Sequence, residues 1–223
     1  MKTKAITSVS EYLIDYLRNE IITGSLASGE KIKEYHLSET LEVSRPILRE
    51  VLRTLESECL VDIIPRKGSY VSTISLEDFI ELYEIREMIE CHAIDLLKSK
   101  KIRIIPQIDQ AIKKESKLKV PSPEASPAEF LEFFETGMVF HSLLIDAAGN
   151  KRLSQYHRGI QYNLLRYHVI QGSENLETKT NVDHSDLVEK LAKGQYGEAK
   201  KYLQDHIKSH AEIIIKNIES REK

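Results

Sequence analysis

The chain has 223 residues, of which 30% are charged, and its formal net charge is −3 at pH 7. This length allows two small domains, and the sequence has no run of 18 apolar residues that could cross a membrane. Residues 1–6 lead into a mixed polar helix and lack the apolar segment of a signal peptide. Cys59 and Cys91 each fall within a helical pattern, which predicts reduced, buried thiols. We therefore expect a cytoplasmic protein with no membrane partner.

A first amphipathic helix is predicted to begin directly after Ser8. Ser8 and Glu11 have the spacing of a capping box, and Gly24 stands where the helix should end. The apolar positions that predict its buried stripe are Val9, Tyr12, Leu13, Tyr16, Leu17 and Ile21.

A second, shorter helix fits residues 35–41, and a third helix begins soon after it. Ser44 is a good N-cap for the third helix, and Pro46 falls in its first turn, where a missing N–H costs nothing. Only Glu42 and Val43 separate the second and third helices, so the two must cross at a steep angle. This is the geometry of a helix-turn-helix.

The third helix has two distinct faces. Apolar residues at three- and four-residue steps predict one buried face, formed by Ile47, Leu48, Val51, Leu52 and Leu55. Arg45, Arg49 and Arg53 recur at every fourth position on another face. Such a stripe is typical of a helix that enters a DNA groove. The alternative is that these arginines only solvate a surface, with Glu50 and Arg53 as an ion pair.

After Leu60 the period of the pattern becomes that of strands. Residues 61–64 and 69–72 fit two strands, joined by a turn in which Gly68 supplies conformational freedom. Arg66 and Lys67 lie in this turn. The segment therefore predicts a basic wing.

Overall charge does not explain DNA binding by this region. Residues 1–75 contain 10 Lys+Arg and 11 Asp+Glu, a balance of −1. The prediction depends instead on the placement of basic residues on the third helix and the wing. The predicted DNA contacts are Ser44, Arg45, Arg49, Arg53, Arg66, Lys67 and Gly68.

These motifs resemble the GntR family of bacterial transcription regulators over about the first 75 residues. The matching segments are Gly29-Glu30-Lys31-Ile32, Val43-Ser44-Arg45, Leu48-Arg49-Glu50-Val51-Leu52 and Pro65-Arg66-Lys67-Gly68. The chain departs from the family at Glu42 and Cys59, where glycine is usual, and at Pro46-Ile47, where Thr-Pro is usual. The resemblance implies that residues 1–74 form a winged helix-turn-helix domain that binds double-stranded operator DNA.

From Leu76 onward the sequence is helical almost to its end. Ser75 and Asp78 cap the first of these helices, and proline and glycine breaks between Pro106 and Gly194 leave about six helices. No period-2 segment of strand length competes with them. We therefore predict a mainly α protein in which residues 75–223 form an antiparallel helical bundle able to hold a small molecule.

Three histidines of this region, His141, His184 and His206, lie with apolar residues at helical spacing. Taken singly, each fits a hydrogen-bonded core histidine. Taken together, three inward-facing imidazoles on three helices could converge on a divalent metal such as zinc or nickel. His210, one turn after His206, fits either a substitute ligand or a surface residue.

The order of these residues resembles the FCD ligand-binding domain of the FadR branch of the GntR family. The matching positions are Phe140-His141, Ala147-Ala148-Gly149-Asn150, His184, Gly194, Ala199 and His206. The resemblance implies a divalent metal bound by three histidines and by an aspartate four residues before the first of them. Gly137 occupies that position here. The site is then either a three-histidine metal site or a degenerate one without metal.

Two charged residues, Arg86 and Glu90, fall on an otherwise apolar stripe of the first bundle helix. Burying a charge is costly unless it is paired or serves a ligand. The two residues therefore form an ion pair at the edge of the bundle or bind an effector. The resemblance places an arginine of this helix against an effector carboxylate, which makes Arg86 the first candidate, with Arg166 and Tyr167 as weaker ones.

The sequence thus predicts a homodimeric, ligand-responsive transcription regulator that binds an inverted-repeat operator. A small, carboxylate-bearing metabolite would change operator affinity because it binds two arrangements of the DNA-binding domains differently. One alternative is a metal-dependent hydrolase with an attached DNA module, although no acidic residue is clearly placed beside the histidines as a general base. A scaffold without a ligand is another alternative. We expect no enzyme activity and name no catalytic residue.

Overall fold

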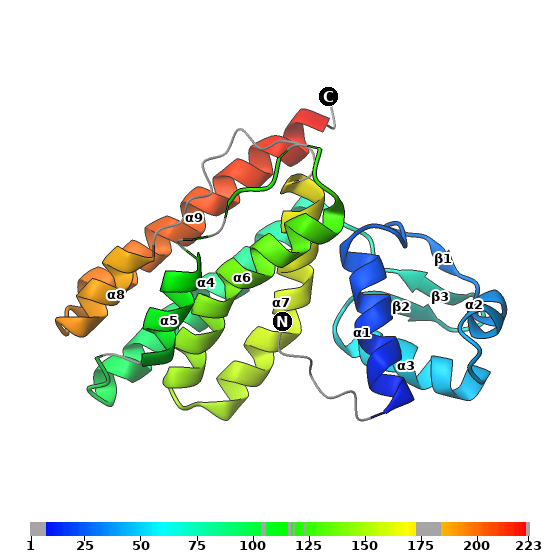
Figure 1. Ribbon diagram of the computed structural model, residues 1–223, viewed down its shortest axis with the longest axis horizontal. Helices are drawn as coiled ribbons and strands as arrows, with labels where there is room; N and C mark the ends of the chain where they lie inside the picture. Colours follow the sequence, from blue (N-terminus) through cyan, green and yellow to red (C-terminus); the bar gives the residue numbers. More distant parts are fainter. Residues whose placement is uncertain are drawn as a thin grey trace. The chain divides into compact units, whose positions relative to one another are not determined.

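The structure is a computed structural model, and it describes residues 8–103, 106–115, 117, 119–122, 124–172 and 184–221. Two compact units are present, one ending at Ile74 and the other beginning at Ser75 (Figure 1). Most of the regular structure is helical, which confirms the predicted fold class. No helix in these described ranges is long and apolar enough to cross a membrane.

The first unit combines helices with a small antiparallel sheet. Its elements are α1 (Val9–Ile22), β1 (Lys31–Ile32), α2 (Glu34–Thr40), α3 (Arg45–Ser57), β2 (Val61–Ile64) and β3 (Gly68–Val71). The strand order is β1-β3-β2, with Val61 opposite Val71 and Ile64 opposite Gly68. The β2–β3 hairpin is the predicted wing. Strand β1 was not predicted, because two residues are too few to show a period of two.

The core of the first unit lies between α1 and α3. Each helix contributes one stripe of buried side chains: Leu13, Leu17 and Ile21 from α1, and Leu48, Val51, Leu52 and Leu55 from α3. The other apolar residues of α1 that were predicted to be buried, Val9, Tyr12 and Tyr16, are exposed. They lie on a neighbouring stripe of the helix, and a helix that packs on one partner buries only the stripe facing it.

The helix starts agree with the sequence in position, although one cap lacks its hydrogen bond. The Ser8 hydroxyl accepts from the backbone N–H of Glu11 (3.2 Å), as expected for the N-cap of α1. Ser44 occupies the N-cap position of α3 with extended backbone, but its side chain makes no capping hydrogen bond. The Ser44 hydroxyl is exposed, so the structure leaves it free for another acceptor or donor.

Among the non-glycine residues with left-handed backbone, two lie in the turns that follow α2 and α3. Glu42 has φ of 53° and Cys59 has φ of 58°, which are the two positions where the resembled family usually has glycine. L-residues adopt this region at a cost that glycine avoids. Because Cys59 lies in the turn that follows α3, its thiol is exposed, and the prediction of a buried thiol there is wrong. Cys91 is buried as predicted.

The second unit is a helical bundle. Its described helices are α4 (Leu76–Ser99), α5 (Pro106–Glu115), α6 (Pro127–Ala147), α7 (Lys151–Gly172), α8 (Ser185–Ala192) and α9 (Tyr196–Arg221). Helix α4 packs against α6, α7 and α9, while α5 packs against α6. Fully buried aromatic rings, among them Phe79, Phe130 and Phe140, fill the space between them. The packing therefore covers one side of α4 with other helices and brings the polar residues of that side into the interior.

Candidate functional site

Basic residues of the first unit lie on α3 and on the wing, and all of them are exposed: Arg45, Arg49, Arg53, Arg66 and Lys67. Arg49 Nε donates to Glu34 Oε2 (2.9 Å), and the other oxygen of Glu34 accepts from the Ser69 hydroxyl (3.0 Å). The hydrogen bond from Arg49 is the main reason that the pKa of Glu34 is lowered. Glu34 thus connects α2, α3 and β3, which sequence analysis missed because the three segments are far apart in the chain.

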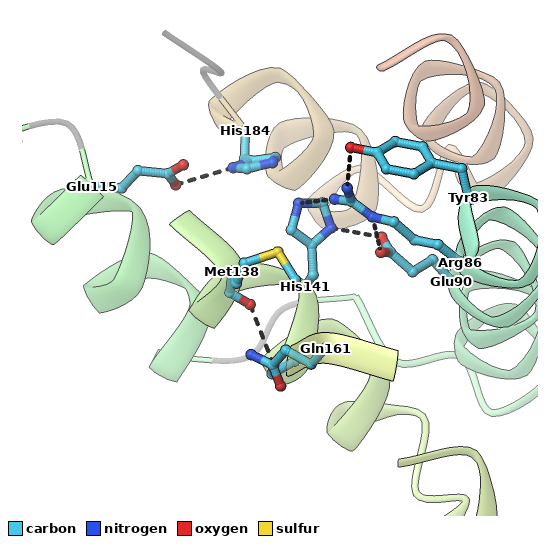
Figure 2. Close-up of polar contacts among 9 residues, drawn as sticks. Tyr83, Arg86, Glu90, Glu115, Met138, His141, Gln161 and His184 are labelled. Atoms are coloured by element: carbon cyan, nitrogen blue, oxygen red, sulfur yellow. Dashed lines mark hydrogen bonds and ion pairs between the residues drawn. The ribbon is translucent and has the colours of Figure 1, made fainter. Parts of the chain in front are cut away.

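A network of charged and polar groups is buried in the second unit (Figure 2). Arg86 is 3% exposed and Glu90 is 0% exposed. Arg86 Nε donates to Glu90 Oε1 (2.8 Å), and the second oxygen of Glu90 lies 2.6 Å from His141 Nδ1. The predicted ion pair between Arg86 and Glu90 is therefore present, but it lies in the bundle interior. Its expected position at the bundle edge is wrong, because α6, α7 and α9 cover this face of α4.

The hydrogen-bond partners of His141 assign its tautomer. Burial lowers the pKa of His141 to about 3, so the imidazole is neutral at pH 7. An ionised carboxylate only accepts and a guanidinium only donates. Nδ1 therefore carries the proton and donates to Glu90, while Nε2 accepts from Arg86 Nη2 (3.0 Å). Burial acts to raise the pKa of Glu90, but the positive charge of Arg86 and the hydrogen bond from His141 outweigh it and keep that pKa below its usual range.

The three predicted histidines converge beside this network. A ring nitrogen of each of His141, His184 and His206 lies within 4.8 Å of the others. The three imidazoles come from α6, from the residue before α8 and from α9. His210 lies against His206, with ring centroids 4.7 Å apart, and burial lowers its pKa to about 4. His210 is half-buried, so the surface alternative does not describe it.

His184 has a carboxylate partner on another helix. Its Nδ1 lies 3.0 Å from Glu115 Oε2 of α5 (Figure 2). Its Nε2 is buried and has no hydrogen-bond partner in the described part of the chain. Sequence analysis considered only α6 as a source of a carboxylate and missed Glu115. The only feature of the local sequence that pointed to Glu115 was its position as the last residue of α5.

The donor set of this cluster fits a divalent metal. Imidazole nitrogens suit zinc and nickel, and the lone pair of His184 Nε2 has no donor to satisfy it. Nitrogens bound to one tetrahedral zinc ion lie about 3.4 Å apart, so three nitrogens within 4.8 Å would have to move closer by up to about 1.4 Å. His141 Nε2, in contrast, already accepts from Arg86. A metal on that nitrogen therefore requires the Arg86 hydrogen bond to break.

The three residues predicted to bind an effector lie in different surroundings. Arg86 contacts the histidine cluster, and its Nη1 lies 3.4 Å from the Tyr83 hydroxyl. Arg166 is buried on α7. The Tyr167 hydroxyl does not join this group, because it donates to Asp78 Oδ2 (2.7 Å) and accepts from the Ser75 N–H (3.1 Å) at the start of α4. The expectation that Tyr167 meets an effector is thus not supported by its contacts.

Residues 10–71 match the model of bacterial regulatory proteins of the gntR family, and residues 81–209 match that of the FCD domain. The chain belongs to the GntR family and carries an FCD domain. It is 26% identical over 206 residues to the uncharacterized HTH-type transcriptional regulator YdhC of Bacillus subtilis, which covers 89% of this chain and 87% of that protein.

Other relatives of this GntR protein agree with that assignment. It is 24% identical over 215 residues to the HTH-type transcriptional repressor GlaR of Escherichia coli, covering 94% of this chain and 96% of GlaR. A crystal structure of a putative transcriptional regulator GntR from Rhodococcus sp. RHA1 has the same fold, with a TM-score of 0.73 at 19% identity and coverage of 92% of this chain and 97% of that one. These relatives are transcription regulators and not enzymes. This GntR protein is therefore a transcription regulator with an FCD effector-binding domain, and the hydrolase alternative has no support.

Proposed function

We propose that this regulator, a member of the FadR branch, acts as a homodimer that binds an inverted-repeat operator. The observation that carries the proposal is the exposed arginine face of α3 beside the basic wing, on a helix whose other face is buried. Two such helices related by a dyad would meet equivalent half-sites in the major groove. The residues proposed to contact DNA are Ser44, Arg45, Arg49, Arg53, Arg66, Lys67 and Gly68.

Exposed apolar side chains on α4 support the dimer. Ile80, Ile85 and Met88 are all exposed on a helix that otherwise contributes to the bundle core. A second copy of the chain would remove these side chains from water.

Selection of binding sequences from random duplex DNA tests the proposal. The expected result is enrichment of an inverted repeat, whose affinity falls steeply with salt because phosphates are neutralised by Lys and Arg. Enrichment of a single half-site, or no enrichment, would contradict a dimer that reads two half-sites. Lys201→Ala removes an exposed positive charge from α9, outside the proposed DNA contacts. It is therefore the control for the effect of overall positive charge on DNA binding.

The buried Arg86 guanidinium supports a carboxylate effector. Glu90 neutralises one side of it, while its Nη2 points at the histidine cluster (Figure 2). A planar guanidinium can bind a carboxylate through two parallel hydrogen bonds. An effector carboxylate that replaces the contacts of Arg86 with Tyr83 (3.4 Å) and His141 (3.0 Å) would meet a charge that is already buried and oriented.

A divalent metal is the proposed cofactor of the same site. His141, His184 and His206 would hold zinc or nickel, and the bound ion would supply a positive charge that attracts the effector carboxylate. Arg86 must leave His141 Nε2 for this to happen, and the released guanidinium then faces the same space. The residues that would hold the ion and the residue that would bind the anion are therefore neighbours.

Melting temperatures of the full chain test both ligands. Nickel or zinc should raise the melting temperature of the native protein and not that of His206→Ala, because a ligand that binds only the folded state stabilises it by mass action. A panel of small carboxylates should then be compared with the corresponding uncharged amides. A carboxylate that stabilises the native protein, but not Arg86→Met, is the expected effector class. Equal shifts with acid and amide would refute recognition by Arg86.

A further inference from the structure

A glycine in the middle of α6 leaves room for a side chain from another helix. Gly137 lies ten residues after the start of α6, where glycine costs about 0.5–1 kcal/mol relative to alanine. A Cβ atom built on Gly137 would lie 3.7 Å from Glu115 Oε1. Alanine would therefore fit in ordinary contact, whereas any longer side chain would compete with the Glu115 carboxylate for the same space.

The other oxygen of this carboxylate holds an imidazole. Glu115 Oε2 lies 3.0 Å from His184 Nδ1, and the two side chains are 16% and 2% exposed. An ionised carboxylate can only accept, so the His184 proton lies on Nδ1. The lone pair is then on Nε2, the buried atom that has no hydrogen-bond partner among the described residues.

The same arrangement occurs at a second histidine of the cluster. His141 Nδ1 donates to Glu90 Oε2, which leaves its lone pair on Nε2 as well. Carboxylates that bind the distal nitrogen of a metal-binding histidine fix its tautomer and orientation and increase its basicity. Glu90 and Glu115 thus make corresponding contacts from two different helices.

We propose that Glu115 is a positioning residue of the metal site, which reaches His184 through the space left by Gly137 and keeps Nε2 directed at the other two imidazoles. This inference rests on the proposed metal site of the FCD domain. Glu115 itself does not bind the ion. A small residue at position 137 is needed because a longer side chain would take the space of this carboxylate.

Cobalt(II) titration of the full chain, followed by visible absorption, tests the inference. Glu115→Ala should weaken cobalt binding roughly 10–100-fold, the usual effect of removing such a contact. Glu115→Gln should recover most of the affinity, because its amide oxygen still accepts from Nδ1. The spectrum at saturation should be the same in all three proteins, because the ligands of the ion do not change. Asp109→Asn, which removes an exposed carboxylate from the same helix, should bind like the native protein.

Substitutions of Gly137 give an independent test. Gly137→Ala should leave cobalt affinity unchanged, while Gly137→Leu should weaken it to the level of Glu115→Ala because the longer side chain displaces the carboxylate. Both substitutions favour helix, so their difference does not come from helix propensity. Equal affinity in the two variants would overturn the role assigned to Gly137.

The remaining outcomes separate this inference from the proposed site. Normal cobalt affinity in Glu115→Ala, with affinity lost in His206→Ala, would overturn the role of Glu115 and leave the metal site in place. A changed spectrum together with equal losses in Glu115→Gln and Glu115→Ala would also overturn it, because Glu115 would then be a ligand. No cobalt binding by the native protein would overturn both. In the metal-free protein, nitrogen NMR should show the Nδ1–H tautomer of His184, and an unchanged tautomer in Glu115→Ala would contradict positioning.

Discussion

Glu90→Ala tests whether the buried network of α4 stabilises the effector domain. Glu90 accepts from Arg86 (2.8 Å) and from His141 (2.6 Å), and its side chain is completely buried. Its removal leaves a guanidinium charge in the interior with no anion and leaves the His141 N–H with no acceptor. Breaking a buried pair in this way costs about 3–5 kcal/mol. Since domains are stable by about 5–15 kcal/mol, this is a large share of the total.

Two further variants test whether the unpaired Arg86 charge, and not merely the loss of the Glu90 side chain, lowers the stability. Arg86→Met combined with Glu90→Met removes both charges, so the double variant should lose less than about 2 kcal/mol, because paired apolar replacements are often close to neutral. Glu87→Ala is the matched control, since Glu87 is on the same helix but partly exposed, and it should lose less than about 1 kcal/mol.

Urea unfolding of the full chain at pH 7, followed by far-UV circular dichroism, measures these changes in the transition of the second unit. The expected order of stability places the double variant above Glu90→Ala although it carries more substitutions. A loss below about 1 kcal/mol in Glu90→Ala would refute the reasoning. A double variant less stable than Glu90→Ala would also refute it, because the unpaired guanidinium would not be the cause.

Further predictions address DNA, assembly and pH. Arg49→Ala should cost about 1–3 kcal/mol of operator binding and reduce sequence preference, while Lys67→Ala should weaken binding to all duplexes and lower the salt slope by about one, as anisotropy would show. Unchanged operator affinity in Arg49→Ala would contradict the predicted contact of Arg49 with the operator. Light scattering should give twice the 25.6 kDa of one chain, and Ile85→Glu with Met88→Glu should give a monomer; a native monomer would contradict the dimer. Burial keeps the pKa of His168 well below its usual value. As the pH drops below about 6.5, this imidazole therefore binds a proton in the unfolded chain before it does so in the folded one, and the free energy of unfolding falls. His168→Gln should reduce this loss by at most about 1.4 kcal/mol per pH unit in urea unfolding, and an unchanged loss would show that His168 is not its source.

Features that depend on local sequence were predictable. The Ser8 cap, the buried stripe of α3 and the wing hairpin all follow from spacing within a few residues. The left-handed turns at Glu42 and Cys59 were signalled only by comparison with the glycines usual in the family, because neither residue type indicates positive φ. Intrinsic preference is a weak guide where tertiary packing imposes the backbone.

Side-chain partners from distant segments were not predictable. The sequence showed that Arg86 and Glu90 share a stripe, but their common contact with His141 depends on how α4 packs against α6. Glu115 reaches His184 only because α5 packs beside Gly137, and no periodicity in the chain contains that information. Sequence analysis therefore missed the carboxylate that contacts His184.

The contacts of α7 suggest how a ligand at Arg86 could affect the start of the effector domain. Arg86 contacts the Tyr83 hydroxyl, which lies 3.1 Å from His168 Nε2, and the preceding residue, Tyr167, binds the backbone of Ser75. A variant that breaks one of these contacts tests whether they transmit ligand binding.

Tyr167→Phe supplies that variant, because it removes the hydroxyl and keeps the ring that packs against Phe79. A carboxylate that binds the native protein should raise the melting temperature of Tyr167→Phe equally. The change it causes in operator affinity, typically 5–150-fold in coupled proteins, should be several-fold smaller in the variant. Anisotropy with and without the carboxylate gives this ratio for both proteins. An identical ratio would mean that the hydrogen bonds at Ser75 only fix the start of α4 and do not transmit ligand binding.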